Sequence, residues 1–284
     1  MLGELICDKQ TYDGAFQGSH GAFSEDAAVH LLDHGATLLP CARLEDVFEA
    51  VDKGVSRYGV IPVENTLAGS VHRSYDLMLE YDLTIVGETV RRIEHALIGL
   101  PGSTLDGIRK VLSHPVALAQ CEEFFRSKPW IEPVSVYDTA GAVDMVVKNG
   151  DLSWAALAGS RAAALWGGVQ LAESIQDHQE NYTRFLMISK PMEFVRPQSR
   201  QYKRTIAFRI ANEPGALCHA LQPFAIRGVD IARIDSRPVK GAPFQYMFYL
   251  DLVGTADYDQ MYDAVEDLRR QAISLKVLGL YSRW

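Results

Sequence analysis

The stretch Asn181-Tyr182-Thr183-Arg184-Phe185-Leu186-Met187-Ile188 decides how the rest of this 284-residue chain is interpreted. It has the pattern of a polar turn that leads into an apolar strand anchored in a core. A hydroxyl and a guanidinium at the start of such a strand suit an anionic substrate that loses an oxygen. Arg184 would hold a carboxylate through two parallel hydrogen bonds, and Thr183 would donate to the leaving group.

Two other interpretations fit the same residues. Asn181-Tyr182-Thr183 matches the pattern of a glycosylation acceptor, and a threonine is also an ordinary strand former. Glycosylation requires secretion, but residues 1–5 lack a basic segment followed by an apolar run. We therefore expect a cytoplasmic protein without a signal peptide, and only the rest of the chain decides between a structural and a catalytic Thr183.

Composition limits the classes of function. Apolar residues make up 48% of the chain and charged residues 23%, which is ordinary for globular proteins and sufficient for two domains. The net charge of -8 argues against nucleic acid as a partner, because no excess of cations exists to displace counterions. The four cysteines are far apart and form no Cys-x-x-Cys pair, so no metal site is predicted. No apolar run approaches the ~20 residues of a membrane span, so no membrane association is predicted.

Strands and helices alternate through the first two thirds of the chain, which predicts an α/β fold with parallel sheets. The predicted strands are 12–17, 58–63, 110–112, 134–137 and 154–158. The predicted helices begin at residues 24, 44, 70, 116, 138 and 160, and the one that begins at 116 extends to 125. Ser24, Asp138 and Ser160 are expected to cap the helices that they begin. Residues 83–100 are extended and too long for one average strand. A chain that crosses between two lobes has this pattern, so we expect two lobes with a cleft between them.

Polar residues follow several predicted strands at the edge where open α/β sheets bind ligands. Glu64-Asn65-Thr66 follows one strand, and Ser113-His114 follows another, with Gln120 on the next helix. The structural alternatives stay open, since Asn65 and Thr66 could cap a helix and His114 could cap the helix after it. The turn at 18–21, before the first helix, suits a small carboxylate on free N–H groups better than a phosphate.

A polar linker at 196–201 precedes a different pattern. The segments 204–210, 214–227, 229–236, 244–253, 258–271 and 274–281 follow the order β-α-β-β-α-β, a ferredoxin-like arrangement. The predicted domains are therefore 1–196 and 203–284.

Several segments, taken together and in this order, resemble the prephenate dehydratase family of the regulated kind. They are Gly21-Ala22-Phe23-Ser24-Glu25, Pro62-Val63-Glu64-Asn65-Thr66, Ser113-His114-Pro115 with Ala119-Gln120-Cys121, Asp138-Thr139-Ala140, Asn181-Tyr182-Thr183-Arg184-Phe185, and Gly215-Ala216-Leu217 with Asp235-Ser236-Arg237-Pro238. The resemblance implies a two-lobed catalytic domain like a periplasmic-binding protein, followed by an ACT regulatory domain. It also implies a lyase that converts prephenate to phenylpyruvate for phenylalanine biosynthesis, without a metal or organic cofactor.

The resemblance also assigns roles to residues. Thr183 would be the catalytic group. The substrate-binding residues would be Glu64, Asn65, Thr66, Ser113, Gln120, Thr139, Arg184 and Phe185. Allosteric control by L-phenylalanine would involve Asn212, Gly215, Ala216, Leu217, Asp235, Ser236 and Arg237, in a homodimer or homotetramer. The sequence departs from the family pattern at Ala22 and Val116, which bear on substrate contacts, and at Asp235, where a glutamate is usual in the effector motif.

Two other functions compete with this interpretation. Arogenate dehydratase performs the same elimination on a substrate with an amino group in place of the keto group. A non-catalytic amino-acid sensor would combine a two-lobed binding domain with a regulatory module. The joint presence of Thr183, Asn65, Ser113 and Gln120 argues against the sensor.

Overall fold

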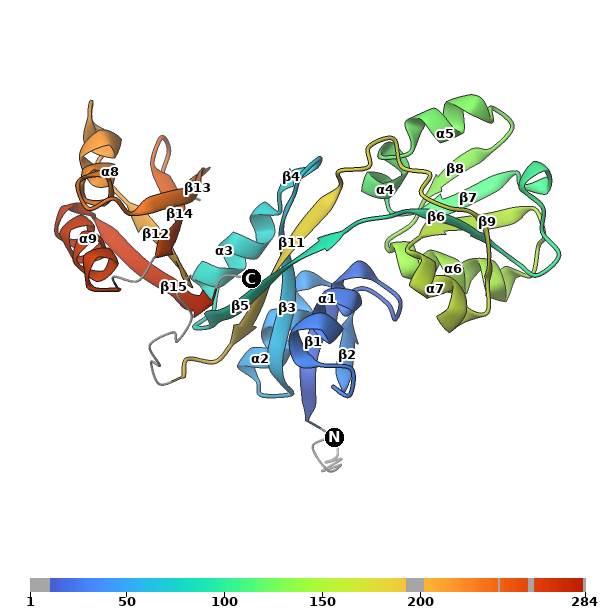
Figure 1. Cartoon of the computed structure of the whole chain (residues 1–284), viewed down its shortest axis with the longest axis horizontal. Helices are drawn as coiled ribbons and strands as arrows, with labels where there is room; N and C mark the ends of the chain where they lie inside the picture. The colour runs from blue at the N-terminus through green and yellow to red at the C-terminus, as the bar shows by residue number, and fades with distance from the viewer. Residues whose placement is uncertain (1–10, 193–201, 240, 255–257, 283–284) are drawn as a thin grey trace. The chain divides into compact units, whose positions relative to one another are not determined.

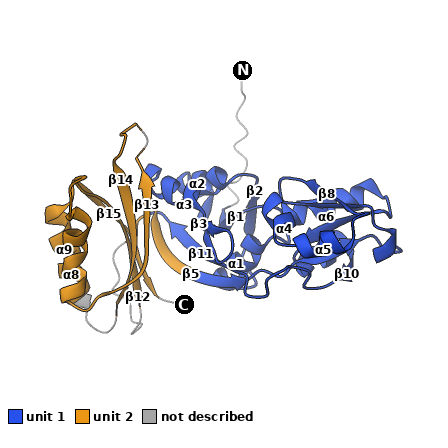
Figure 2. Cartoon of the chain, turned by 90° about the horizontal axis from the view of Figure 1, so that it is seen from above, with its two compact units in different colours: residues 1–82, 89–190 blue, residues 83–88, 191–284 orange. Residues whose placement is uncertain are grey.

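The computed structural model describes residues 11–192, 202–239, 241–254 and 258–282, which form two compact units (Figure 2). Unit 1 comprises residues 1–82 and 89–190, and unit 2 comprises residues 83–88 and 191–284. The linker predicted at 196–201 lies outside the described residues. No helix in the described part of the chain is long and apolar enough to cross a membrane.

The first lobe of unit 1 consists of residues 11–82 and 182–190. Its strands have the order β11-β3-β1-β2, in which β1 is parallel to β2 and β3 while β11 is antiparallel to β3. Its elements are β1 (Tyr12–Gln17), α1 (Phe23–Leu32), β2 (Leu38–Cys41), α2 (Leu44–Asp52), β3 (Ser56–Asn65), β4 (Gly69–Ser70), α3 (His72–Glu80) and β11 (Tyr182–Ser189). The buried, continuous apolar run Val60-Ile61 in β3 is typical of a strand covered on both faces.

The second lobe consists of residues 96–172. Its sheet has the order β10-β6-β9-β7-β8, with β7 parallel to both β8 and β9. Its elements are β6 (Ala96–Gly99), the 3-10 turn Leu105–Gly107, β7 (Lys110–Ser113), α4 (Pro115–Ala119), α5 (Glu122–Ser127), β8 (Glu132–Ser135), α6 (Thr139–Asn149), β9 (Trp154–Ala158), α7 (Ser160–Trp166) and β10 (Val169–Ala172). The predicted two-lobed α/β architecture is confirmed.

Two segments connect the lobes (Figure 1). The extended stretch predicted at 83–100 forms β5 (Thr84–Arg92) and then β6, and the chain returns through residues 173–181 into β11. β5 begins within unit 2 and ends within unit 1. The strand that crosses between the lobes therefore also links the two units covalently.

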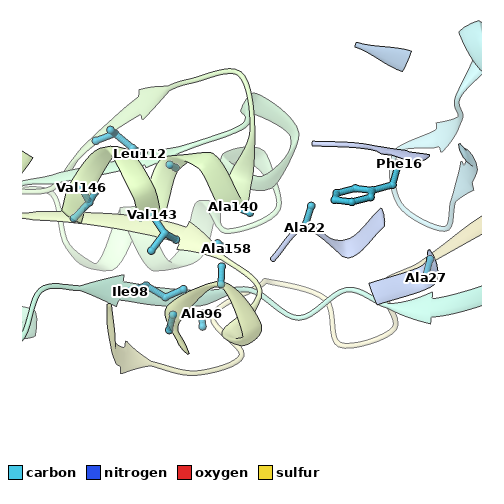
Figure 3. Packing of buried hydrophobic residues seen from close by; sticks show 14 of the residues in the cluster. Phe16, Ala22, Ala27, Ala96, Ile98, Leu112, Ala140, Val143, Val146 and Ala158 are labelled. Atoms are coloured by element: carbon cyan, nitrogen blue, oxygen red, sulfur yellow. The ribbon is translucent and has the colours of Figure 1, made fainter. Parts of the chain in front are cut away.

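One hydrophobic core extends over both lobes. Phe16 and Ala22 from the first lobe belong to the same buried cluster as Ala140 and Ala158 from the second (Figure 3). The lobes approach closely at Gly21, where a Cβ atom would lie 2.8 Å from the Cα atom of Ala162. Gly21 also has a φ of 93°, which favours glycine. Both the backbone conformation and the packing of the lobes thus require glycine at position 21.

Unit 2 has the predicted ferredoxin-like order. Its elements are β12 (Tyr202–Arg209), α8 (Ala216–Ile226), β13 (Asp230–Pro238), β14 (Tyr246–Gly254), α9 (Tyr258–Gln271) and β15 (Ser274–Ser282). The antiparallel strands have the order β13-β14-β12-β15, and both helices cover one face of the sheet (Figure 2). Phe224 of α8 and Leu268 of α9 are fully buried against Ile206 of β12.

Several local predictions need correction. Ser24 does not cap α1, because the chain enters the helix one residue earlier and the N-cap is Ala22. Ser160 likewise does not cap α7, since Gly159 holds the N-cap position. The helix predicted at 116–125 is two helices, because the side chain of Asp177 accepts the N–H groups of Glu122 and Glu123 and starts α5 there. The cap predicted at Asp138 is confirmed, and its carboxylate accepts from the first turn of α6.

Candidate active site

Thr183 and Asn65 stand opposite each other where β11 pairs with β3. The Nδ2 atom of Asn65 donates to the Oγ1 atom of Thr183 over 2.9 Å, and Thr183 is 9% exposed. The Oδ1 atom of Asn65 accepts the N–H groups of Leu67 and Ala68 at 3.0 and 2.8 Å. These two bonds fix the amide so that its NH₂ group must face Thr183. Because that group occupies an acceptor position of the hydroxyl, the single proton of Thr183 is left to donate elsewhere.

A β-bulge in β3 positions this pair. Thr183 pairs with Asn65 and Arg184 with Glu64, but Phe185 pairs with Pro62, so Val63 is an extra residue. Side chains alternate along a regular strand, so residues 62 and 65 would normally point to opposite faces. Because the bulge adds one residue to β3, the side chains of Pro62 and Asn65 point to the same side, and both line the same cavity.

A chain of neutral amides extends from Asn65 away from Thr183, and we call Asn65, Asn181 and Gln120 the amide relay. Asn65 Nδ2 donates to Asn181 Oδ1 over 2.8 Å, and Asn181 Nδ2 donates to Gln120 Oε1 over 2.9 Å. His95 Nε2 lies 3.0 Å from the same Gln120 oxygen. His95 is 2% exposed, and its burial lowers its pKa, an effect that the hydrogen bond to Gln120 opposes in part. The ring is therefore neutral near pH 7.

A cavity of about 250 Å³ lies along this arrangement, with Thr183, Asn65, Gln120 and His95 all in its lining. It is lined from both lobes by Phe23, Ser24, Pro62, Asn65, Ala68, Val71, Ile93, His95, His114, Val116, Ala117, Gln120, Thr139, Thr183 and Phe185. A neighbouring cavity of about 270 Å³ is also lined by Phe23, Ser24, Pro62, His114 and Thr139. The two share a wall and together extend from Thr183 to the start of α1.

Neutral groups supply the hydrogen-bond donors of this site. None of the described residues that line the two cavities is a lysine or an arginine. The first turn of α1 reaches both cavities through Phe23 and Ser24, and its N-cap residue, Ala22, makes no side-chain hydrogen bond to it. The N–H groups of a first helical turn have no partner within the helix, and together with the helix dipole they favour a carboxylate. His114 accepts the N–H of Val116 through Nδ1 at 3.2 Å, and partial desolvation lowers its pKa.

The structure brings together part of the predicted substrate-binding set. Asn65, Gln120, Thr139 and Phe185 line the cavity with Thr183. Both hydrogens of the Asn65 NH₂ group are already engaged by Asn181, Thr183 and the carbonyl of Tyr182, so Asn65 orients its neighbours in this arrangement.

The other predicted substrate-binding residues lie outside the two cavities. Ser113 is fully buried, and its hydroxyl donates to the carbonyl of Leu157 over 2.6 Å. Thr66 is exposed and ties the end of β3 to the start of β11, since its Oγ1 donates to Glu180 O and accepts from Tyr182 N. Neither Asn65 nor Thr66 caps α3, whose N-cap is Val71.

Arg184 and Glu64 face away from the cavity. They are paired across the strands, and each is adjacent to a residue that lines the cavity, Thr183 or Asn65. Since successive side chains alternate, this cross-strand pair points to the opposite side of the sheet.

The predicted effector residues lie on two elements of unit 2. Asn212 precedes α8, Gly215 is its N-cap with a φ of 83°, and Ala216 and Leu217 begin it. On β13, the carboxylate of Asp235 accepts from Arg233 over 2.6 Å and from the N–H of Ser236 over 2.8 Å, and Arg237 follows. Whether these residues hold a ligand stays a prediction.

Sequence reasoning did not identify Asn181 or His95 as parts of the site. Asn181 begins one of the family-like segments, but no role in the site was predicted for it, and it is fully buried at the centre of the relay. His95 directly precedes the apolar run that begins at Ala96, and a buried polar residue at such a place is a signal worth following. Among the described residues, no group of three His, Cys, Asp or Glu side chains could hold a metal ion.

Comparisons with known proteins agree with this architecture. A family model described as prephenate dehydratase matches residues 15–193, and one described as ACT domain matches residues 204–270. The chain is 37% identical over 290 residues to arogenate dehydratase/prephenate dehydratase 2 of Arabidopsis thaliana, covering 99% of this chain and 75% of that one. It is 36% identical over 284 residues to the bifunctional chorismate mutase/prephenate dehydratase of Stutzerimonas stutzeri, covering 100% of this chain and 76% of that one.

Two solved structures are also similar. Prephenate dehydratase from Arthrobacter aurescens, in complex with L-Phe, is 30% identical, with a TM-score of 0.86 and coverage of 95% of this chain and 89% of that one. GqqA, described as a novel type of quorum quenching acylase, is 35% identical, with a TM-score of 0.87 and coverage of 95% of this chain and 98% of that one.

Proposed function

The chain belongs to the prephenate dehydratase family, and on that premise we propose that it converts prephenate to phenylpyruvate, with Thr183 assisting departure of the ring hydroxyl. Membership makes it a lyase-type dehydratase of phenylalanine biosynthesis. The proposal adds the substrate and the role of a particular hydroxyl.

The direction of the hydrogen bond between Asn65 and Thr183 carries this proposal. Asn65 donates to the threonine oxygen, so the threonine proton is free to act on a group in the cavity. Hydroxide is a poor leaving group and needs a proton donor. A threonine hydroxyl is a weak acid, so the bond from Thr183 tightens, or its proton moves in concert, as the carbon–oxygen bond breaks. Help of this kind is typically worth roughly 10²–10⁴ in rate.

The electrons for this departure come from the ring carboxylate, which leaves as carbon dioxide. The absence of lysine and arginine from the described cavity lining suits this step, because a cation would stabilise the carboxylate that must be lost. The other carboxylate of the substrate needs a holder. The first turn of α1, at Phe23 and Ser24, offers neutral N–H donors. We therefore assign the binding of this carboxylate to that turn and not to Arg184. The remaining rate gain comes from orientation and fixed dipoles.

A direct assay tests the proposal. Purified protein is incubated with prephenate, and phenylpyruvate is followed by its absorbance at alkaline pH. Product formation is expected, and a protein that binds prephenate without turnover would support the sensor instead. Competition between prephenate and arogenate in one reaction decides between the two substrates, since relatives of both kinds are similar to this chain.

One of the similar solved structures, GqqA, gives a reason to test a second activity. GqqA is described as an acylase and is 35% identical to this chain. Amide hydrolysis needs an activated nucleophile, and both Ser24 and His114 line the cavity. Ser24→Ala separates the activities, because it would abolish acylase activity and leave the hydroxyl of Thr183 in place.

The ACT domain supports a proposal for regulation. The Arthrobacter aurescens relative was solved with L-Phe, and unit 2 of this chain matches the ACT family model. We infer that L-phenylalanine binds unit 2 at the start of α8 and on β13 in a homo-oligomer. Calorimetric titration of the whole chain with L-phenylalanine, against Asp235→Ala, tests the ligand, and light scattering tests the assembly. The cytoplasmic location stays a prediction.

A further inference from the structure

His95 lies at the far end of the amide relay from Thr183, on the segment between β5 and β6. Its backbone is fixed on both sides, because its N–H donates to Gln176 Oε1 over 2.9 Å and its carbonyl accepts from Ile175 N over 3.0 Å. Its ring packs edge-on against Phe23, with 5.7 Å between the ring centroids. The ring is thus held in one orientation, with Nε2 toward Gln120.

The hydrogen-bond polarity of the relay assigns the tautomer of this ring. The N–H groups of Leu67 and Ala68 fix Asn65, so Asn65 must present its NH₂ group to Asn181. Asn181 must then accept with Oδ1 and donate with Nδ2, which requires the oxygen of Gln120 on its other side. An oxygen cannot donate, so His95 Nε2 must carry the proton that Gln120 Oε1 accepts.

On the basis of the proposed function, we propose that His95 is a positioning residue, whose Nε2–H locks the relay in the polarity that leaves the proton of Thr183 free for the substrate. Without this donor, Gln120 can rotate and present its NH₂ group to Asn181. Asn181 would then turn its own NH₂ group toward that of Asn65, and two donors would face each other. Relief of that conflict displaces Asn65 from Thr183.

A double-mutant cycle tests this role. His95→Leu removes the donor, and we expect kcat on prephenate to fall ~10- to 100-fold with KM little changed, because the loss acts through the orientation of a reacting group. In the Thr183→Ala background the same change should alter kcat by less than about twofold, since no hydroxyl remains to orient. An equal fall in both backgrounds would overturn the proposal, because it would show a merely structural effect.

Two variants serve as controls. His95→Gln keeps an N–H donor near the position of Nε2 and should recover most of the activity lost in His95→Leu. His178→Leu makes the same exchange at an exposed histidine of unit 1 and should leave kcat unchanged. A His95→Gln enzyme as slow as His95→Leu would also overturn the proposal.

A spectroscopic measurement on the unmodified protein is independent of turnover. In protein labelled with ¹⁵N-histidine, two-bond correlation spectra distinguish the two tautomers of each ring. We expect a protonated Nε2 and a bare Nδ1 for His95 at neutral pH, and a protonated Nδ1 with a bare Nε2 would overturn the assignment. If prephenate is not a substrate, the proposed function fails while this experiment still decides the polarity of the relay.

Discussion

The amide relay of unit 1 and a buried ion pair of unit 2 hold their polar side chains in different ways. The relay consists of neutral amides, of which Asn181 is fully buried, joined to one another and to Thr183 by bonds of 2.8 to 2.9 Å. Unit 2 buries charge, since Lys203 Nζ on β12 lies 2.9 Å from the carboxylate of Glu88 on β5. These two side chains are 12% and 3% exposed. The comparison shows what each kind of network contributes.

Neutral amides have distinct donor and acceptor ends, so a chain of them sets a direction without the cost of burying charge. A buried ion pair attracts more strongly, but it must offset the desolvation of both ions, and the loss of one partner leaves an unpaired charge. The relay of unit 1 therefore suits the orientation of a reactive proton. The pair of unit 2 suits the attachment of the start of β5 to the sheet of unit 2.

The largest effect is expected when the relay loses the group that it orients. Thr183→Ala should lower kcat on prephenate by roughly 10²–10⁴, with KM little changed, because the hydroxyl acts on the leaving group in the transition state. Steady-state kinetics measures both constants. Thr183→Ser is the matched control, since it retains the hydroxyl and should retain most activity. A normal kcat in Thr183→Ala would contradict the assigned role.

A comparably large effect on stability is expected in unit 2. Lys203→Met leaves the carboxylate of Glu88 buried without this partner, which should cost about 3–5 kcal/mol of unfolding free energy. Urea denaturation with hydrogen exchange at β12 and β15 measures it. Lys53→Met removes a lysine that pairs with Glu49 on the exposed surface of α2, and little change is expected there. Equal effects of both changes would show that burial of the pair does not matter.

The next effect comes from reversing one bond of the relay. Asn65→Asp keeps the shape and the acceptor for Leu67 and Ala68, but it replaces the donor to Thr183 with an acceptor. The threonine proton would then bind the new carboxylate, so kcat should fall by roughly 10²–10³, as when an active-site donor is lost.

An isosteric exchange in unit 2 is the control for this reversal. Asp251→Asn retains an acceptor for the Thr205 hydroxyl, which donates over 2.7 Å, and should leave kcat unchanged. Full activity in Asn65→Asp would mean that the direction of the bond is irrelevant.

The sequence predicts most of this fold because its information is local. Alternating strands and helices gave the two lobes, and the order of elements gave the ferredoxin-like unit 2. The break after α4 could not be found in this way, because it depends on Asp177, whose carboxylate caps α5 from a distant part of the chain. The bulge at Val63 has the same origin, since it exists only in the pairing with β11.

The site was predicted in part for related reasons. The motif around Thr183 located the strand and the reactive hydroxyl, but motif membership does not tell which side chain faces the cavity. Thr183 and Arg184 were both assigned to one cleft, although adjacent strand residues point to opposite faces. That distinction follows from the alternation rule alone. The role of Asn181 and His95 requires hydrogen-bond partners far apart in sequence, which no local pattern contains.

The smallest effect expected is a dependence of stability on pH that arises from histidines of unit 1. Desolvation lowers the pKa values of His95 and His114 in the folded chain, so below the ordinary histidine value of about 6.5 the unfolded chain binds protons that the native chain does not. Stability is therefore complete above pH 6.5 and falls as the pH decreases toward the folded pKa. The slope is at most about 1.4 kcal/mol per pH unit for one histidine.

Urea unfolding between pH 5 and pH 8 measures this slope. The pKa values of Asp13, Glu45 and Asp151 are also lowered, by hydrogen bonds, but carboxyl groups take up protons only near pH 4, below this window. His95→Gln has no titrating group at this position and should reduce the slope, leaving the contribution of His114. If that variant keeps the full slope of unfolding free energy against pH, a group other than His95 is responsible. The assignment of a lowered pKa to His95 would then be wrong.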